Sequence, residues 1–366
     1  MTVKRFLKDS KNLIQLYRSY EKKELDIKHF PPLVLIEVAG KCNLSCIMCP
    51  NSLYKEKAEA KGIMDFELFK KIVDNIHTYT SVVFLHLGGE VLLNPKLVDM
   101  VRYLKKNGLS VVFYTNAIML TEKKSKELIL AGVDMISFSI DGYTKEEYER
   151  IRVGGKFDMA IKGINTFLKA KKELKKKNPH TIIQVIEFGK ENPDDKQRFF
   201  DLFRDNPPND ISVIYPIAWG NEFKGTDRFE FKDKEQKEYN PCAWPWTMAG
   251  ILWNGDVIPC SVDFFGEYVY GNMKDQTFEE IWFGEKPRIL REAMVNKTYA
   301  QVKNQCNGCD TLTVGKQFGL VAGVRRVFLS QLSHHFGFGF DKKVRNILDK
   351  VYTNAKFKQQ NPYKKK

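Results

Sequence analysis

Three of the seven cysteines lie within eight positions, as Cys42, Cys46 and Cys49 in the stretch CNLSCIMC. Their spacing is C-x3-C-x2-C, and an apolar run at 33–38 comes shortly before them. Thiolate sulfur is a soft ligand that suits zinc or iron and sulfur, and a [4Fe-4S] cluster normally takes four thiolates. Three cysteines would leave one iron open for a further ligand, as catalytic metal sites keep one position free.

The other four cysteines are enough for one closed metal site. They are Cys242, Cys260, Cys306 and Cys309. From their number alone, a structural zinc and a [4Fe-4S] cluster both remain open, because each accepts four thiolates. An odd total with close pairs is unlike a secreted disulfide framework, and the charged first residues do not resemble a signal peptide. We therefore expect a cytoplasmic protein whose cysteines bind metal.

Further motifs come at the ends of predicted strands. GGEVLLNP at 88–95 and FSIDG at 138–142 each end an apolar run, and Arg152 follows in YERIRVGGKFD. Taken alone, these are equally well a tight turn, a strand ending in an Asp-Gly turn, and a surface ion pair. Together, in this order, they indicate a site at the carboxyl edge of a parallel sheet, where α/β folds place their active sites.

With CNLSCIMC, these motifs resemble the signature of the radical S-adenosylmethionine (radical SAM) enzymes. The resemblance implies a [4Fe-4S] cluster on the first three cysteines, whose open iron binds the methionine part of S-adenosylmethionine (SAM). One electron from the cluster then cleaves SAM to a 5'-deoxyadenosyl radical, which abstracts a hydrogen atom from the substrate. An electron donor such as flavodoxin or ferredoxin is a further implied partner.

The resemblance also assigns contacts with the cofactor to six residues. They are Met48, Gly88, Gly89, Glu90, Ser139 and Arg152. The Gly-Gly-Glu loop would meet the ammonium group of SAM, the serine its ribose or carboxylate, and the arginine a carboxylate, while the methionine backbone would touch adenine. Val91 stands where the family usually has proline, which concerns only the rigidity of the loop.

The region from 241 to 310 resembles the SPASM extension of radical SAM enzymes, or its shortened twitch form. The resemblance rests on the spacing from Gly255 to Cys260 and on Gly-Asn and Glu-Ile-Trp at 271–272 and 280–282. It implies a second, auxiliary [4Fe-4S] cluster on the remaining four cysteines. Full SPASM modules carry further cysteines after the C-x2-C pair, and CDTLTVGK supplies none.

The elements that must position these motifs follow from the alternation of β-branched runs with charged, helix-periodic stretches. Strands are predicted at 33–38, 81–87, 110–115, 134–140, 181–188 and 210–217, and helices at 65–79, 96–108, 121–132 and 157–177. This pattern predicts an α/β fold with a parallel sheet. The resemblance implies a partial (β/α)6 TIM-like barrel with a small C-terminal SPASM/twitch domain.

Four parts are expected along the chain: an N-terminal helical extension at 1–32, a radical SAM core at 33–220, a SPASM/twitch auxiliary-cluster domain at 221–312, and an amphipathic, basic tail at 313–366. Asn-Gly at 254–255 between apolar runs predicts a hairpin in the third part.

The net charge of +14 is concentrated at the two ends. Residues 1–31 hold eight cationic side chains against four acidic ones, and residues 310–366 hold twelve against three. A nucleic-acid enzyme more often lines its groove with the excess, so no nucleic-acid partner is expected. The tail would suit a peripheral membrane contact, or equally a helix packed across the barrel mouth.

The two cluster sites, with three and four cysteines, together use all seven cysteines of the chain. No thiol is left to return a hydrogen atom to a substrate radical. We therefore expect an oxidoreductase of the dehydrogenase type. It would oxidise a small polar or carbohydrate-like substrate with the auxiliary cluster as electron acceptor, and Glu187, Asp263 or a histidine would be the base. A peptide-modifying SPASM maturase is the alternative, disfavoured by the short stretch before residue 33. Alternatives of another class are a zinc-binding or a nucleic-acid-interacting protein.

Overall fold

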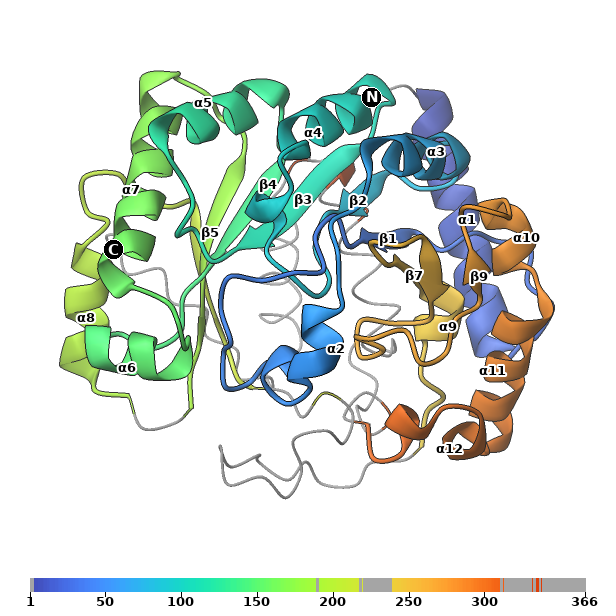
Figure 1. Cartoon of the computed structure of the whole chain (residues 1–366). Coiled ribbons are helices and arrows are strands. Elements are labelled where there is room, and N and C mark those ends of the chain that lie inside the picture. The colour runs from blue at the N-terminus through green and yellow to red at the C-terminus, as the bar shows by residue number, and fades with distance from the viewer. Residues whose placement is uncertain are drawn as a thin grey trace, which may run out of the picture.

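The computed structural model describes residues 3–188, 191–216, 219 and 239–309, and the single residues 312, 331, 334, 335 and 337. Within these residues nine strands form one sheet, in the order β6-β5-β4-β3-β2-β1-β7-β8-β9 (Figure 1). The predicted tail at 313–366 lies outside them except for four single positions. No helix in the described stretches is long and apolar enough to cross a membrane.

The first six strands are parallel and lie side by side in chain order. They are β1 (Leu33–Ile36), β2 (Val82–Phe84), β3 (Ser110–Thr115), β4 (Met135–Ser139), β5 (His180–Ile186) and β6 (Asp210–Ile214). Each begins and ends within three residues of its prediction. The predicted α/β fold class is confirmed: these strands, with the helices between them, form the parallel sheet of a partial barrel.

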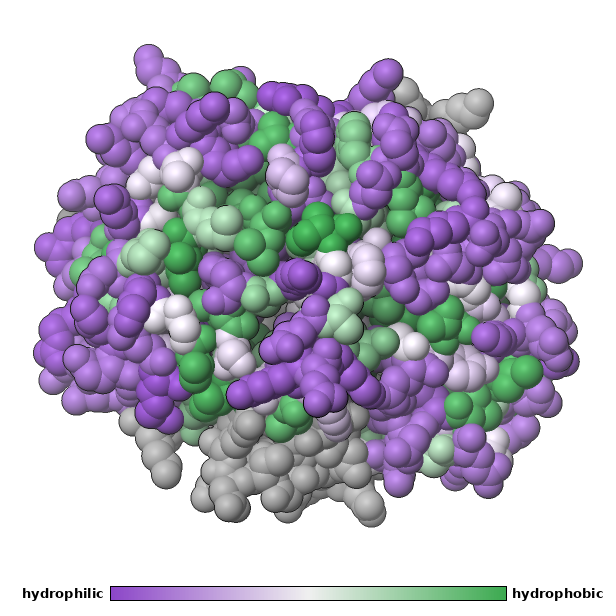
Figure 2. All heavy atoms as spheres, in the orientation of Figure 1, coloured by the Kyte–Doolittle hydropathy of each residue, from purple (hydrophilic) through white to green (hydrophobic). Residues whose placement is uncertain are grey.

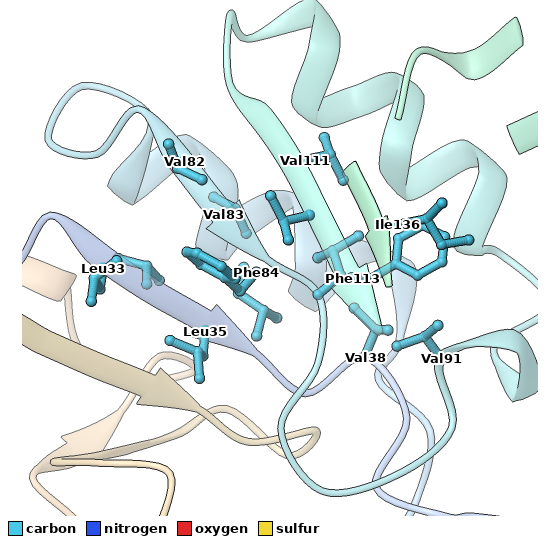
Figure 3. Packing of buried hydrophobic residues seen from close by; sticks show 14 of the residues in the cluster. Leu33, Leu35, Val38, Val82, Val83, Phe84, Val91, Val111, Phe113 and Ile136 are labelled. Atoms are coloured by element: carbon cyan, nitrogen blue, oxygen red, sulfur yellow. The ribbon is translucent and has the colours of Figure 1, made fainter. Parts of the chain in front are cut away.

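The apolar character of these strands explains why they form the core. β1 and β2 are buried at every position, as expected for parallel strands covered on both faces. Side chains from four consecutive strands, among them Leu35, Phe84, Phe113 and Ile136, gather in one apolar cluster (Figure 3). β5 instead alternates buried and half-buried residues, so only one of its faces is fully covered.

Helices between the strands cover the outer side of this sheet (Figure 1). The long ones are α3 (Phe66–Ile76), α4 (Leu97–Lys106), α5 (Glu122–Ala131), α7 (Phe157–Glu173) and α8 (Pro193–Asp201), and a short one is α6 (Lys145–Ile151). The short α2 (Lys55–Glu59) follows the first cysteine loop instead and has no buried residue. The helix ends match local sequence signals. The Asp65 carboxylate caps α3 by accepting from two backbone N–H groups, and α5 ends at Gly132 in the left-handed region.

Hydrophilic side chains cover the helices at the rim of the molecule, and hydrophobic ones gather toward the middle of the face in view (Figure 2). This is the distribution expected when each helix turns its apolar stripe toward the sheet and its charged residues toward water.

The C-terminal module continues the same sheet on the free side of β1. It contains β7 (Met248–Ile251), β8 (Asp256–Ile258), β9 (Gly271–Asn272), α9 (Trp244–Thr247), α10 (Phe278–Trp282), α11 (Glu285–Asn296) and α12 (Tyr299–Val302). β7 pairs with β1 in parallel, with Leu33 opposite Met248 and Ile36 opposite Ile251. The second cysteine region is thereby attached to the strand that leads into the first one.

The hairpin predicted at Asn254-Gly255 is confirmed. β7 and β8 are antiparallel, with Gly250 opposite Ile258, and Gly255 has φ +94°. A non-glycine residue rarely adopts this conformation, which accounts for the glycine.

The N-terminal helix α1 (Val3–Glu21) and the segment after it pack against this module. The buried Tyr20 hydroxyl donates to the carbonyl of Pro241 at 2.6 Å, and the Trp246 indole donates to the carbonyl of Glu24 at 2.8 Å. The start of the chain is therefore tied to the auxiliary module. The boundary expected at 220–221 lies outside the described residues.

Candidate active site and auxiliary cluster site

The first cysteine loop begins just after the carboxyl end of β1 and is held in place by the backbone at the end of α6. Ser45 donates to the carbonyl of Val153, and Ile47 donates to the carbonyl of Ile151, both at 2.9 Å. Cys46 is 8% exposed, and Cys42 and Cys49 are half-buried. Leu44, Met48 and Ile151 form an apolar cluster with Cys46. The three thiols therefore lie on one ordered loop in apolar surroundings.

The surroundings keep these thiols neutral when nothing is bound to them. Burial raises the pKa of Cys42 and of Cys49 to about 12, and it also raises the pKa of Cys46. Thiolates at these positions therefore need a cation that displaces the protons. Three soft donors on one loop fit three corners of an iron–sulfur cluster.

The loop after β2 is pressed against the cysteine loop, and its glycines make this approach possible. A Cβ on Gly89 would lie 2.2 Å from the carbonyl oxygen of Ala39 and 2.4 Å from that of Lys41. The backbone N–H of Glu90 donates to the same Lys41 carbonyl at 2.9 Å. The side chain of Asn51 donates to the carbonyl of Gly88 at 3.2 Å. The predicted glycine motif and the cysteine motif thus form one continuous wall.

Glu90 is 2% exposed, and its contacts are internal. Its carboxylate accepts from the Thr115 hydroxyl at 2.6 Å, the Asn116 backbone at 2.8 Å and the Leu92 backbone at 3.1 Å. It therefore ties the end of β2 to the end of β3. The side chain of Asn116 continues this network by donating to Asn43 of the cysteine loop at 2.8 Å.

Arg152 lies behind the cysteine loop in a buried ion pair. Its guanidinium is 2.7 Å from the carboxylate of Asp141, which also accepts from the backbone of Ile186 at 3.0 Å. The Arg152 Nε–H is buried and has no hydrogen-bond partner in the described part of the chain. Burial alone would lower the pKa of the Arg152 guanidinium, but the neighbouring charges, led by the Asp141 carboxylate, together outweigh this effect and raise the pKa. An unsatisfied buried N–H beside the thiols fits an anionic group, either a cluster thiolate or the carboxylate of SAM.

The two remaining predicted contact residues lie on either side. Ser139 ends β4, where it pairs with Gln184 of β5 and is half-buried. The backbone carbonyl of Met48 accepts from the Trp219 indole at 2.9 Å. Adenine binding through this carbonyl would therefore share or replace the indole contact.

The acids named as candidate bases both have cationic partners. The Glu187 carboxylate accepts from the Tyr143 hydroxyl at 2.5 Å and pairs with Lys196 at 2.6 Å. Asp263 is buried and pairs with Lys303 at 3.3 Å. The ring of His86 packs against Phe84 and Tyr114. Among the described residues, the geometry singles out none of the three as the base.

The other four cysteines meet at one cavity in the C-terminal module. All four are buried. The cavity is lined by Cys242, Trp244, Pro245, Pro259, Cys260, Val262, Leu290, Met294, Lys303, Gln305, Cys306, Cys309 and Leu312. Burial raises the pKa of Cys260 to about 11 and raises that of Cys306 further. The sequence predicts these cysteines as one ligand set, and a shared, mostly apolar cavity with a single lysine fits a closed cluster.

A buried ion pair between the two cysteine regions was missed from the sequence. The Lys61 ammonium lies 2.7 Å from the Glu37 carboxylate, just after β1, and donates to the carbonyl of Phe264 at 2.8 Å. A Cβ on Gly88 would lie 2.5 Å from the Lys61 nitrogen, so the pair also abuts the glycine loop. No motif spacing marks these residues, and only the fold brings them together.

Comparison with protein families agrees with this division of the chain. Residues 36–202 match the radical SAM superfamily, and residues 242–310 match the SPASM iron–sulfur cluster-binding domain. The first match runs from the last residue of β1 to the end of α8 and contains the first three cysteines. The second contains the other four, which decides between zinc and iron–sulfur in favour of the latter.

Several curated proteins are similar over most of the chain. The tungsten-containing aldehyde ferredoxin oxidoreductase cofactor-modifying protein of Pyrococcus furiosus is 24% identical over 75% of this chain and 86% of its own. An AdoMet-dependent heme synthase of Methanosarcina barkeri is 24% identical over 76% of this chain and 88% of its own.

Solved structures show the same fold. BtrN in complex with AdoMet and 2-DOIA has a TM-score of 0.50 at 19% identity, covering 81% of this chain and all of BtrN. Streptococcus suis SuiB bound to its precursor peptide has a TM-score of 0.56 at 16% identity, covering 74% of this chain and 69% of SuiB.

The cofactors of a protein with these two domains are SAM, a [4Fe-4S] cluster that binds it, and an auxiliary iron–sulfur cluster. The chain belongs to the radical SAM superfamily and carries a C-terminal SPASM domain.

Proposed function

We propose that this enzyme oxidises an alcohol of a small polar, carbohydrate-like substrate to a carbonyl, as a radical SAM oxidoreductase of the dehydrogenase type. Cys42, Cys46 and Cys49 hold the SAM-binding cluster in this proposal, and the other four cysteines hold the auxiliary cluster. The SAM contacts in this proposal are the six residues named from the sequence, and the buried Arg152 Nε–H, which has no hydrogen-bond partner among the described residues, supports one of them.

The single observation that carries the proposal is the four-cysteine cavity. All four thiols that remain after the first loop line it, so a cubane cluster there has a thiolate for each iron and no open position for substrate. Electron transfer is the role left for such a cluster. None of the seven cysteines is in a disulfide, which suits the reducing cytoplasm.

The reaction balances as follows. When bound and reduced, the SAM cluster and SAM supply a 5'-deoxyadenosyl radical that takes one hydrogen atom from the substrate C–H. The substrate hydroxyl then loses its proton to a base, and one electron leaves as the C=O bond forms. An auxiliary cluster held by Cys242, Cys260, Cys306 and Cys309 would accept that electron, and a donor of the flavodoxin or ferredoxin kind would supply the electron used to cleave SAM.

The radical step is tested with the reduced holoenzyme and SAM. Formation of 5'-deoxyadenosine is expected from the native protein and from Lys123→Ala, an exposed change on α5. Cys46→Ala removes one of the three thiolates and is expected to abolish the product. Persistence of 5'-deoxyadenosine in that variant would refute the ligand assignment.

The substrate class is tested with deuterated polyols. A true substrate, deuterated at the reacting carbon, transfers deuterium to 5'-deoxyadenosine and gives one carbonyl product for each 5'-deoxyadenosine formed. Turnover by an aminocyclitol or sugar alcohol in this assay is the expected result. If none transfers deuterium while a peptide or tetrapyrrole does, the carbohydrate proposal is wrong.

Modification of a larger cofactor or a peptide is the second candidate. It is favoured by the two relatives that match three quarters of the chain, one named for cofactor modification and one for heme synthesis. A peptide maturase has weaker support, since the mycofactocin maturase of Mycobacterium tuberculosis is 28% identical over only 37% of this chain. The deuterium assay separates these candidates from the first.

A further inference from the structure

Two buried lysine–carboxylate pairs lie among the described residues, one beside each cysteine region. Lys61 pairs with Glu37 at 2.7 Å, and their side chains are 6% and 0% exposed. Lys303 pairs with Asp263 at 3.3 Å, and their side chains are 1% and 0% exposed. Removing a charge from water costs several kcal/mol even when it is paired, so neither pair is explained by stability alone.

Lys303 belongs to the wall of the four-cysteine cavity. Its carbonyl accepts from the backbone of Cys306 at 3.0 Å, and its ammonium also donates to the side chain of Gln305 at 3.0 Å. Its charge acts on the sulfurs of Cys260 and Cys306. Among the described residues that line this cavity, it is the one lysine, and no arginine, aspartate or glutamate lies beside it in the wall.

The two pairs are joined by neighbouring residues. Asp263, the partner of Lys303, is followed in the chain by Phe264, whose carbonyl accepts from Lys61 at 2.8 Å. The Lys61 ammonium also lies 4.2 Å from the centre of the Phe264 ring. A continuous line of contacts therefore runs from the Gly88 loop through Glu37 and Lys61 to the auxiliary cavity.

A buried cation beside a cluster favours the state that carries one more electron. The net charge around the sulfurs, the hydrogen bonds they accept and their exposure to solvent set the potentials of iron–sulfur clusters. The cavity is mostly apolar and the pair is shielded from water, so the lysine charge acts there with little screening.

We propose that Lys303 is the positioning residue that raises the reduction potential of the auxiliary cluster, so that this cluster accepts the substrate electron. Asp263 limits the effect by partly neutralising the lysine. The inference rests on the proposed function, in which one electron passes from the deprotonated substrate radical to the auxiliary cluster.

The test measures the reduction potential of each cluster in the holoenzyme that contains both, by a redox titration monitored with electron paramagnetic resonance. Lys303→Met is expected to lower the reduction potential of the auxiliary cluster. We expect a shift of at least tenfold toward the oxidised form, which for a one-electron couple corresponds to a potential about 59 mV lower. Lys303→Arg keeps the charge and is expected to restore most of the potential. The SAM cluster in the same sample serves as the internal reference.

Two further variants keep the test decisive. Asp263→Asn removes the neutralising charge and is expected to shift the potential upward, and it serves alone if Lys303→Met fails to retain its cluster. Lys274→Met removes a surface charge from the same module and is expected to change nothing. An unchanged auxiliary potential in Lys303→Met with full iron content, or a downward shift in Asp263→Asn, would overturn the inference.

Failure here is distinguishable from failure of the proposed function. The potentials are measured without substrate, so a shift in Lys303→Met stands even if no polyol is oxidised. Conversely, deuterium transfer from a polyol with unchanged potentials removes only the role of Lys303.

Discussion

At the scale of single residues, the site is held by buried polar groups and by glycines that leave no room for a side chain. The Glu90 carboxylate satisfies three donors from the ends of β2 and β3. Gly89 lies against two backbone carbonyls that lead into the cysteine loop. The motif residues therefore position each other, and the glycine contacts cannot yield without moving backbone.

Gly89→Ala is expected to impair SAM cleavage strongly. The new Cβ would lie 2.2 Å from the Ala39 carbonyl oxygen, so the two loops must separate. A displacement on the order of 1 Å costs about 100-fold in a positioned reaction, and we expect a loss of this size in 5'-deoxyadenosine formation.

Gly108→Ala is the matched control for that variant. A Cβ at Gly108 meets nothing within 4 Å, although φ is +72°. It should cost about 1–2 kcal/mol of unfolding free energy and leave SAM cleavage intact. Equal activity of the two variants would show that the loop contact is not required.

At the scale of elements, local sequence patterns predict the position and the ends of a single strand or helix. They do not predict which strands or side chains from distant parts of the chain pair with each other. The run VVF at 82–84 and the caps of α3 and α5 are readable from neighbouring residues. The β1–β7 pairing joins residues more than 200 positions apart, and no local periodicity encodes it. Glu37 and Lys61 escaped prediction for the same reason, since their pairing depends on the fold.

The hairpin between β7 and β8 is expected to control the auxiliary cluster through Gly255. Gly255→Val forces a β-branched residue to φ +94°, and its Cβ would lie 2.9 Å from the Asn272 side-chain oxygen. Such strain costs about 1–3 kcal/mol. Because β8 ends just before Cys260, we expect reduced occupancy of the auxiliary cluster and an intact SAM cluster, measured by iron content and spectroscopy.

Asn254→Ala is the comparison for the hairpin. It removes two hydrogen bonds between the Asn254 side chain and Asp256 and leaves the glycine in place. If Gly255→Val lost both clusters equally, the damage would be global and the hairpin would have no specific role.

At the scale of the whole molecule, the two cysteine regions contribute differently to the core. Cys242, Cys306 and Cys309 belong to the main apolar cluster that includes the sheet and α11, whereas Cys46 belongs to a small separate cluster under its loop. The auxiliary site is therefore part of the folding core, and the first loop is an attachment to it.

Removal of iron by chelation under reducing conditions is expected to destabilise the C-terminal module most. An empty four-cysteine cavity loses the bonds that join α9, β8 and the end of the module, and metal binding is folding free energy. We expect a lower midpoint of thermal unfolding, with proteolysis first within residues 239–309. Cys46→Ala, which disturbs only the first site, should unfold close to the native holoprotein; an equal drop in both samples would contradict this difference.

The register between β1 and β7 has a geometric consequence. β1 leads into the first cysteine loop, and β7 leads through the hairpin to Cys260, so four consecutive residue pairs fix how far one metal site lies from the other along the strands. A slip of one residue would move them by about 3.3 Å and turn every side chain of the strand to the opposite face. The register of these two strands therefore sets the separation of the two cysteine sites, and backbone hydrogen bonds hold it in place.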